Sequence, residues 1–248
     1  MPKILIALTA SDHWTLNDET LHPTGFWAEE LLSPLQVFSD AGIDADLASP
    51  DGKTPVVDEG SLAPDAIGEE ESAKQRKALD ALAGRLESTL VLADVDLSSY
   101  DAVFVPGGHG PMEDLAVSDD LGRILVTMLD DGKVVSSVCH GPAGLLPAKR
   151  ADGSWLFAGR NLTAFTDAEE EQAGLADKAP WLLESRLREA GANFSSGEAW
   201  APFVVVDDKL VTGQKRRRAP RLRRRSSDCS RPDDRGRRPS GCRRRADQ

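Results

Sequence analysis

Short apolar segments recur along the chain, and amphipathic segments and turn residues separate them. In runs such as KILIAL and DAVFV every residue after the first is apolar, which is typical of strands buried on both faces of a sheet. Strands and helices alternate, so we predict an α/β fold with a mostly parallel central sheet and helices on both faces. The expected strands lie at residues 3–8, 44–49, 133–138 and 162–165. Residues 101–110 form a strand that runs into a glycine-rich turn, and residues 203–213 form a hairpin-like pair.

The clearest predicted helix spans residues 118–132. Its apolar side chains recur at i, i+3, i+4, i+7 and i+8, and Ser118 and Gly132 suit its two caps. A second helix, which Pro34 should kink, is predicted at 22–42. Other helical segments are expected at 180–191, within the polar stretch 58–93, and directly after Cys139.

Charge divides the chain into two parts. The chain has 30 basic and 41 acidic residues. Positions 215–248 hold 15 of the basic and 4 of the acidic residues, a net charge of +11. Positions 1–214, the acidic body, therefore hold 15 basic and 37 acidic residues, a net charge of −22. The field of the body would repel phosphates, which argues against nucleic-acid binding there.

The basic tail, residues 215–248, contains 14 arginines and one lysine and has almost no apolar side chains. We expect it to be disordered. One hypothesis is an arm that binds nucleic acid non-specifically, or acidic partners. The favoured interpretation is an out-of-frame end, because arginine far exceeds lysine and the change of composition is abrupt.

The sequence also bears on the location of the protein in the cell and on covalent or metal cross-links. No apolar run approaches the ~18 residues of a membrane span, and the N-terminus has no basic and long apolar signal pattern. We therefore expect a cytoplasmic protein without a membrane partner. The acidic body has a single thiol, which excludes an internal disulfide framework and a cysteine zinc cage.

That thiol, Cys139, lies between a predicted strand and a predicted helix in VVSSVCHGPAG. A lone cysteine is more often a small buried hydrophobe, but this is the position of a nucleophile in a strand–turn–helix elbow. We expect the helix N-terminus and His140 to lower the pKa of the thiol. The context therefore favours a reactive cysteine.

A second glycine-rich turn, PGGHG, ends the neighbouring predicted strand. Gly107 and Gly108 could form a simple tight turn, or could present backbone N–H groups to a developing oxyanion. We favour the oxyanion role because both turns should meet at the carboxyl edge of the sheet. No phosphate-binding glycine motif is present in the sequence.

Histidine is scarce, and no histidine follows His140. A glutaminase-type triad, whose base lies in the last third of the chain, is thereby excluded. His140 is the first candidate base and His109 the second. An imidazole next to its cysteine needs a carboxylate from elsewhere to orient it.

Two places in the sequence offer that carboxylate or a proton shuttle. Glu30 lies among aromatic and aliphatic neighbours in a predicted helix, where burial would raise its pKa. Glu170 follows the predicted strand 162–165 and should reach the same edge of the sheet. From position alone, Glu169, Glu170 and Glu171 are equivalent.

Several long segments, in the right order, resemble the ThiJ/PfpI superfamily. They match most closely its stress-inducible branch of glutathione-independent glyoxalases (glyoxalase III) and heat-shock chaperones. The resemblance covers residues 1–214, a class I glutamine amidotransferase-like domain. Its main segments are HPTGFWAEEL, SPDGKTPVVDEGSL, VFVPGGHGPMEDL, VCHGPAGLL, FTDAEEE and LVTGQ.

The resemblance implies a flavodoxin-like α/β sandwich and a homodimer. It places the nucleophile at Cys139 with His140 beside it. The acid that holds the histidine falls on Glu170, and the carboxylate facing the thiol falls on Glu30. The oxyanion turn falls on Gly107 and Gly108, and the backbone N–H of His140 assists it.

The implied reaction converts methylglyoxal to D-lactate through a hemithioacetal on the cysteine, formally a lyase reaction. It needs no metal or organic cofactor, because thiol, base and oxyanion donors suffice. One alternative is a holdase chaperone or redox stress sensor. Another is a cysteine amidase or peptidase-like hydrolase, which would use the same thiol.

We predict that the basic tail contributes nothing to catalysis. A chain truncated after Gln214 should keep its methylglyoxal activity per folded molecule and lose any affinity for nucleic acid. Replacing the tail with the helix that follows TGQ in this family should raise the melting temperature. A truncated protein that folds but is inactive would place the arginine-rich tail in the site.

Overall fold

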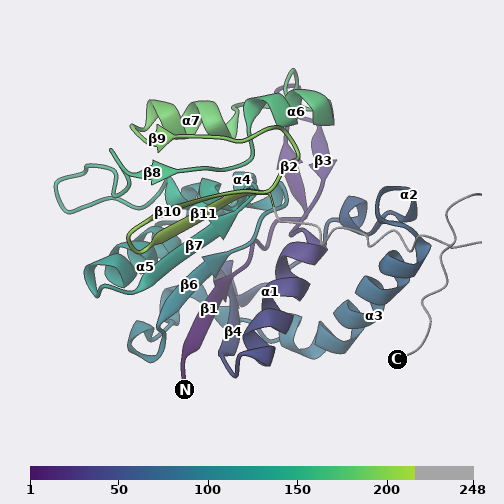
Figure 1. The fold of residues 1–248 in the computed structure, drawn as a ribbon, viewed down its shortest axis with the longest axis horizontal. Coiled ribbons are helices and arrows are strands. Elements are labelled where there is room, and N and C mark those ends of the chain that lie inside the picture. The colour runs from purple at the N-terminus through teal and green to yellow at the C-terminus, as the bar shows by residue number, and fades with distance from the viewer. Residues whose placement is uncertain (216–248) are drawn as a thin grey trace, which may run out of the picture. The chain divides into compact units, whose positions relative to one another are not determined.

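A seven-stranded sheet forms the centre of the molecule (Figure 1). The computed structural model describes residues 1–215. The strand order is β10-β11-β7-β6-β1-β4-β5, and every neighbouring pair is parallel except the hairpin β10–β11. This confirms the predicted α/β fold. The strands are β1 (Lys3–Ala7), β4 (Asp44–Ser49), β5 (Leu90–Val91), β6 (Ala102–Val105), β7 (Val134–Val138), β10 (Phe203–Asp207) and β11 (Leu210–Lys215).

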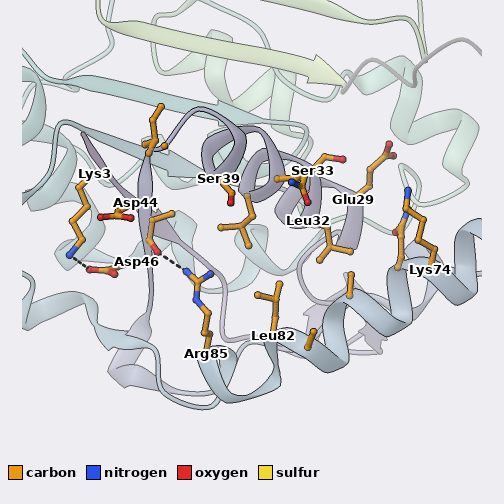
Figure 2. Close-up of a pocket in the computed structure, with 18 of the residues that line it drawn as sticks. Lys3, Glu29, Leu32, Ser33, Ser39, Asp44, Asp46, Lys74, Leu82 and Arg85 are labelled. Carbon is orange, nitrogen blue, oxygen red and sulfur yellow. Dashed lines mark hydrogen bonds and ion pairs between the residues drawn. The ribbon is translucent and has the colours of Figure 1, made fainter. Parts of the chain in front are cut away.

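Two helices, α1 (Ala28–Asp40) and α3 (Glu69–Leu86), cover the β1–β4 half of one face. Ile4 and Ile6 of β1 pack in one cluster with Leu31 of α1 and Leu86 of α3. A hollow of about 870 Å³ separates the two helices near the start of β1, and charged side chains such as Lys3 line its rim (Figure 2).

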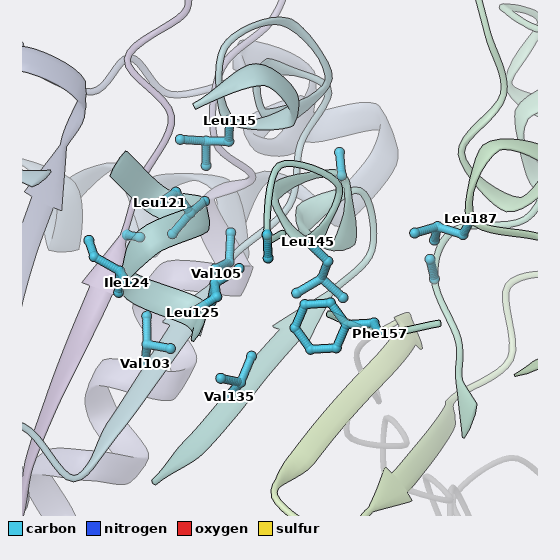
Figure 3. Close-up of a cluster of buried hydrophobic side chains, with 14 of the residues drawn as sticks. Val103, Val105, Leu115, Leu121, Ile124, Leu125, Val135, Leu145, Phe157 and Leu187 are labelled. Atoms are coloured by element: carbon cyan, nitrogen blue, oxygen red, sulfur yellow. The ribbon is translucent and has the colours of Figure 1, made fainter. Parts of the chain in front are cut away.

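The opposite face is covered by α5 (Asp119–Asp130) and the segment after β7. Because strand side chains alternate, Leu5 and Ala7 of β1 point to this face, as do Val103 and Val105 of β6. The apolar stripe of α5 packs here, and Ser118 caps the helix by accepting a hydrogen bond from Leu121 N–H (3.2 Å). Figure 3 shows this fully buried cluster.

The remaining elements lie outside the central sheet; β8 runs beside the β10–β11 hairpin, where Thr163 N–H donates to the hydroxyl of Thr212 (2.9 Å). Two small pairs, β2–β3 and β8–β9, form separate two-stranded sheets. Among the described residues, no helix is both long and apolar enough to cross a membrane. The elements are β2 (His13–Thr15), β3 (Leu21–Pro23), α2 (Pro64–Ile67), α4 (Gly110–Glu113), β8 (Asn161–Leu162), α6 (Asp167–Ala173), α7 (Leu183–Glu189) and β9 (Asn193–Phe194), with short 3₁₀ turns between them.

The helix predicted at 22–42 is shorter than expected and begins only at Ala28. Tertiary hydrogen bonds keep the preceding residues extended: Phe26 N–H donates to the carbonyl of Val56 (2.9 Å), and Trp27 N–H to that of Gly107 (3.0 Å). Glu30 consequently lies in the first turn of α1 rather than in the middle of a helix.

Two other local predictions are also corrected. The strand predicted at 162–165 is only β8, and it pairs with β9 outside the central sheet. After Cys139 the chain forms a 3₁₀ helix of five residues, Gly141–Leu145, instead of an α-helix.

The face of β7, β10 and β11 is open among the described residues. A hollow of about 700 Å³ lies over it, and Phe104, Val138 and Val211 line this space. Val204 and Val206 of β10 are 60% and 65% exposed. The tail beyond residue 215, and the predictions that concern it, lie outside the described residues.

The turn after β6 packs so closely on the end of β7 that it leaves no room for a side chain. A Cβ on Gly107 would lie 2.7 Å from the Cβ of Cys139 and 2.7 Å from Glu30 Oε2. Gly108 has a φ of +93°, and a Cβ there would lie 2.2 Å from the carbonyl oxygen of Gly25. These two glycines therefore bring the two turns and α1 together.

We predict that Gly107→Ala destabilises the protein by about 1–3 kcal/mol, the usual range for overpacking. Gly84 in α3 is the matched control, because a Cβ there meets nothing within 4 Å. Gly84→Ala should raise stability by about 0.5–1 kcal/mol through helix propensity. Urea unfolding of both variants measures the difference, and equal stabilities would contradict the close approach.

Candidate active site

Cys139 follows β7 directly and has a φ of +60°, a left-handed conformation that is uncommon for a residue with a side chain. Its N–H donates to the carbonyl of Gly213 (2.9 Å), and its own carbonyl accepts from Phe165 N–H (2.8 Å). Neighbouring backbone from two directions thus holds the strained residue in place. This arrangement is typical of a nucleophile held on a sharp turn at a sheet edge.

Glu30 faces the thiol from α1 and is only 4% exposed. Gly107 N–H donates to Glu30 Oε2 (2.9 Å), which fixes the carboxylate beside Cys139. That donor is therefore engaged with Glu30 rather than directed at an oxyanion. The backbone N–H groups of Gly108 and His140 point to Sγ, and the oxyanion role stays a prediction for that pair.

The thiol is more strongly protonated than the sequence suggested. Burial, and after it the charge of Glu30, raise the pKa of Cys139, while hydrogen bonds from Gly108 and His140 N–H act in the opposite direction. The expected lowering of this pKa is wrong, because burial and the charge of Glu30 outweigh the backbone hydrogen bonds; a five-residue 3₁₀ turn, not an α-helix, follows the cysteine. While Glu30 is ionised, the thiol needs a base close by to lose its proton.

His140 is positioned to be that base. Its Nδ1 lies 3.4 Å from Cys139 Sγ, and its Nε2 lies 2.7 Å from Glu170 Oε2. An ionised carboxylate can only accept hydrogen bonds, so we assign the imidazole proton to Nε2, which leaves the lone pair of Nδ1 facing the thiol.

The second oxygen of Glu170 has a partner as well. Glu170 Oε1 lies 2.9 Å from His109 Nε2, and the His109 and His140 rings are 4.0 Å apart, centroid to centroid. The carboxylate thus stands between two imidazoles and is itself 3% exposed. The result is a continuous row of polar groups from Cys139 through His140 and Glu170 to His109.

Charges in this row are set by burial and by hydrogen bonding. Burial alone would raise the pKa of Glu170, but hydrogen bonds from His109 and His140 outweigh it and hold this pKa well below its usual range. Burial, followed by the charge of His109, lowers the pKa of His140 to about 4. At neutral pH Glu170 is therefore ionised and His140 is a neutral base.

The structure selects Glu170 among the three adjacent glutamates. Glu169 caps α6: Thr166 and Glu169 exchange side-chain hydrogen bonds with each other's backbone N–H. Trp200 N–H binds the other carboxylate oxygen of Glu169 (2.7 Å). Glu171 is exposed. Only Glu170 turns toward the histidines.

The side chains with the spacing of metal ligands coincide with this row of polar groups. Within residues 1–215, the one group of His, Cys, Asp and Glu side chains close enough to share an ion is His109, His140 and Glu170, with ligand atoms within 4.8 Å of one another. Hydrogen bonds already join these atoms, so we assign the group to proton handling. His109, His140 and Glu170 do not line the hollow between α1 and α3.

The residues predicted from the sequence meet at one place: Cys139, His140, Glu30 and Glu170, with Gly107 and Gly108 against them. Sequence reasoning ranked His109 second as a base and missed its bond to Glu170. It also missed the backbone of Phe165 and Gly213 as supports of Cys139. The glycine-flanked histidine in PGGHG was the only signal that could have pointed to His109.

Known proteins similar to this chain include enzymes named as glyoxalases. Glyoxalase 3 of Candida albicans is 34% identical over 221 residues, covering 86% of this chain and 92% of that protein. A glutathione-independent glyoxalase of Saccharomyces cerevisiae is 32% identical over 220 residues, covering 85% and 90%.

Two solved structures are similar as well. The crystal structure of glyoxalase III from Candida albicans has a TM-score of 0.72 and 31% identity, covering 85% of this chain and 90% of that one. The rapid encystment protein of Francisella tularensis has a TM-score of 0.77 and 30% identity, covering 87% and 92%. Residues 21–227 match the DJ-1/PfpI family. This chain belongs to the DJ-1/PfpI family.

Proposed function

We propose that this protein is a glutathione-independent glyoxalase that converts methylglyoxal to D-lactate. The observation that carries the proposal is the placement of one buried thiol, Cys139, between a carboxylate, Glu30, and a histidine held by Glu170. Relatives that share about a third of its residues are named as glyoxalases. A homodimer and a cytoplasmic location accompany the proposal as predictions.

In the first step, Sγ of Cys139 adds to the aldehyde carbon of methylglyoxal. His140 Nδ1, 3.4 Å away, accepts the thiol proton, and the aldehyde oxygen takes up a proton to complete a hemithioacetal. The N–H groups of Gly108 and His140 would stabilise the negative charge that develops on this oxygen. The protein thiol takes the place of glutathione.

In the second step, a base removes the hydrogen from the carbon that bears sulfur, which gives an enediol. Glu30, whose carboxylate lies beside the thiol, can take up this proton and return it to the adjacent carbon. The ketone oxygen gains a proton and the hydroxyl on the sulfur-bearing carbon loses one, so the product is a lactoyl thioester on Cys139. Water then releases lactate and restores the thiol, so the net reaction consumes one water.

Purified protein incubated with methylglyoxal, without glutathione, should form D-lactate. Cys139→Ala should abolish this activity and leave the fold intact, because it removes the only thiol of the acidic body. The matched controls are Cys229→Ala and Cys242→Ala, which should have wild-type activity. Undiminished D-lactate formation by Cys139→Ala would end the glyoxalase proposal.

Glu30→Gln should lose turnover while its thiol can still be alkylated by iodoacetamide. A carboxamide can hydrogen-bond near Cys139 but cannot relay a proton, and proton relay contributes about 10²–10⁴-fold. Glu29→Gln is the control, because Glu29 lines the hollow between α1 and α3 instead. The same pair separates an enzyme from a redox sensor, since a sensor could function with glutamine at position 30.

A further inference from the structure

We infer that His109 is a positioning residue of this site: it holds the second oxygen of Glu170 and so fixes the carboxylate that orients His140. The turnover part of this inference rests on the proposed function. The thiol-reactivity part does not, because it concerns only the chemistry of Cys139 itself.

The geometry around Glu170 carries the inference. Each carboxylate oxygen has its own imidazole partner, His140 Nε2 at 2.7 Å and His109 Nε2 at 2.9 Å. Glu170 is buried, so water does not replace a lost donor without rearrangement. If His109 did not donate, one buried carboxylate oxygen would lose its partner, and the carboxylate could rotate away from His140.

His109 is itself held rigidly. Trp14 of β2 stacks on its ring at 5.2 Å with an interplanar angle of 18°, and His22 of β3 meets it edge-on at 6.0 Å. The β2 strand is anchored in turn, because Thr15 donates from its N–H and its hydroxyl to the carboxylate of Glu113 (2.8 and 2.9 Å). The β2–β3 pair thus supports the active site from outside the central sheet.

The charged and titratable groups around His109 determine the sign of a pH effect. Glu170 of α6, His140 after β7 and His22 of β3 contact it, and the charge of Glu169 also acts on His140. Without His109, Glu170 loses a hydrogen bond that lowers its pKa. The pKa of His140, which burial lowers first, also loses the lowering effect of the His109 charge. Both pKa values therefore rise, and the limb of the rate that increases with pH moves to higher pH.

Two variants of matched length separate donation from packing. His109→Gln can place an amide N–H near the position of Nε2, whereas His109→Met has a similar shape and cannot donate. We expect His109→Met to lower kcat about tenfold and to change KM less. A tenfold loss is part of the roughly 10²–10⁴-fold in rate that a positioned base supplies. His109→Gln should recover most of this loss.

The alkylation of Cys139 by iodoacetamide, followed by peptide mass spectrometry against pH, tests the inference without any assumption about substrate. The alkylation rate should rise with pH as His140 becomes neutral and can accept the thiol proton. This rise should move to higher pH in His109→Met and return toward its wild-type position in His109→Gln. Identical pH profiles in the wild type and His109→Met would overturn the inference. A shift in alkylation in a protein without glyoxalase activity would support the inference and reject the proposed function.

The wild-type protein provides a test that no folding defect can obscure. The chain has four histidines, so ¹⁵N-labelled imidazoles can be assigned one by one. At neutral pH, His109 and His140 should both carry a proton on Nε2 that is coupled to Glu170. An Nδ1–H tautomer without an Nε2 proton at His109 would show that it does not donate to the carboxylate, and would overturn the inference.

Discussion

The left-handed backbone of Cys139 is the constraint on which the site depends. A conformation of this kind costs of order 1–3 kcal/mol and persists only where its surroundings enforce it. Here the hydrogen bonds to Gly213 and from Phe165 enforce it, and Gly107 lets the neighbouring turn come within contact of the cysteine. The sheet, the glycine turn and the segment before α6 all converge on this one residue.

Two buried carboxylates then have different tasks because their partners differ. Burial disfavours the charge on any carboxylate, and Glu170 overcomes it through two imidazole donors. It therefore stays ionised and orients His140. Glu30 accepts a hydrogen bond from Gly107 N–H and lies beside the thiol of Cys139. It is therefore placed to exchange a proton with groups at the thiol. Environments that separate the roles of two acids are a general device of proton-transfer enzymes.

The fold was predictable because apolar strands and amphipathic helices alternate, and α5 with its cap followed directly from spacing. The start of α1 could not be predicted from the sequence, because hydrogen bonds to residues far away in the chain hold Phe26 and Trp27 extended. The identity of the orienting acid was partly encoded: Thr166 and Glu169 have the spacing of a capping box, which assigns Glu169 to the helix end. The raised pKa of Cys139 depends on burial and on the charge of Glu30, which no local pattern shows.

The central claim is that one thiol performs the chemistry, and partial chemical modification tests it most directly. Wild-type protein is treated with limiting iodoacetamide, and each sample is divided between a D-lactate assay and peptide mass spectrometry. The remaining activity should fall in direct proportion to the fraction of Cys139 that is modified, whatever the labelling of Cys229 and Cys242. Activity that survives complete modification of Cys139 would contradict the account.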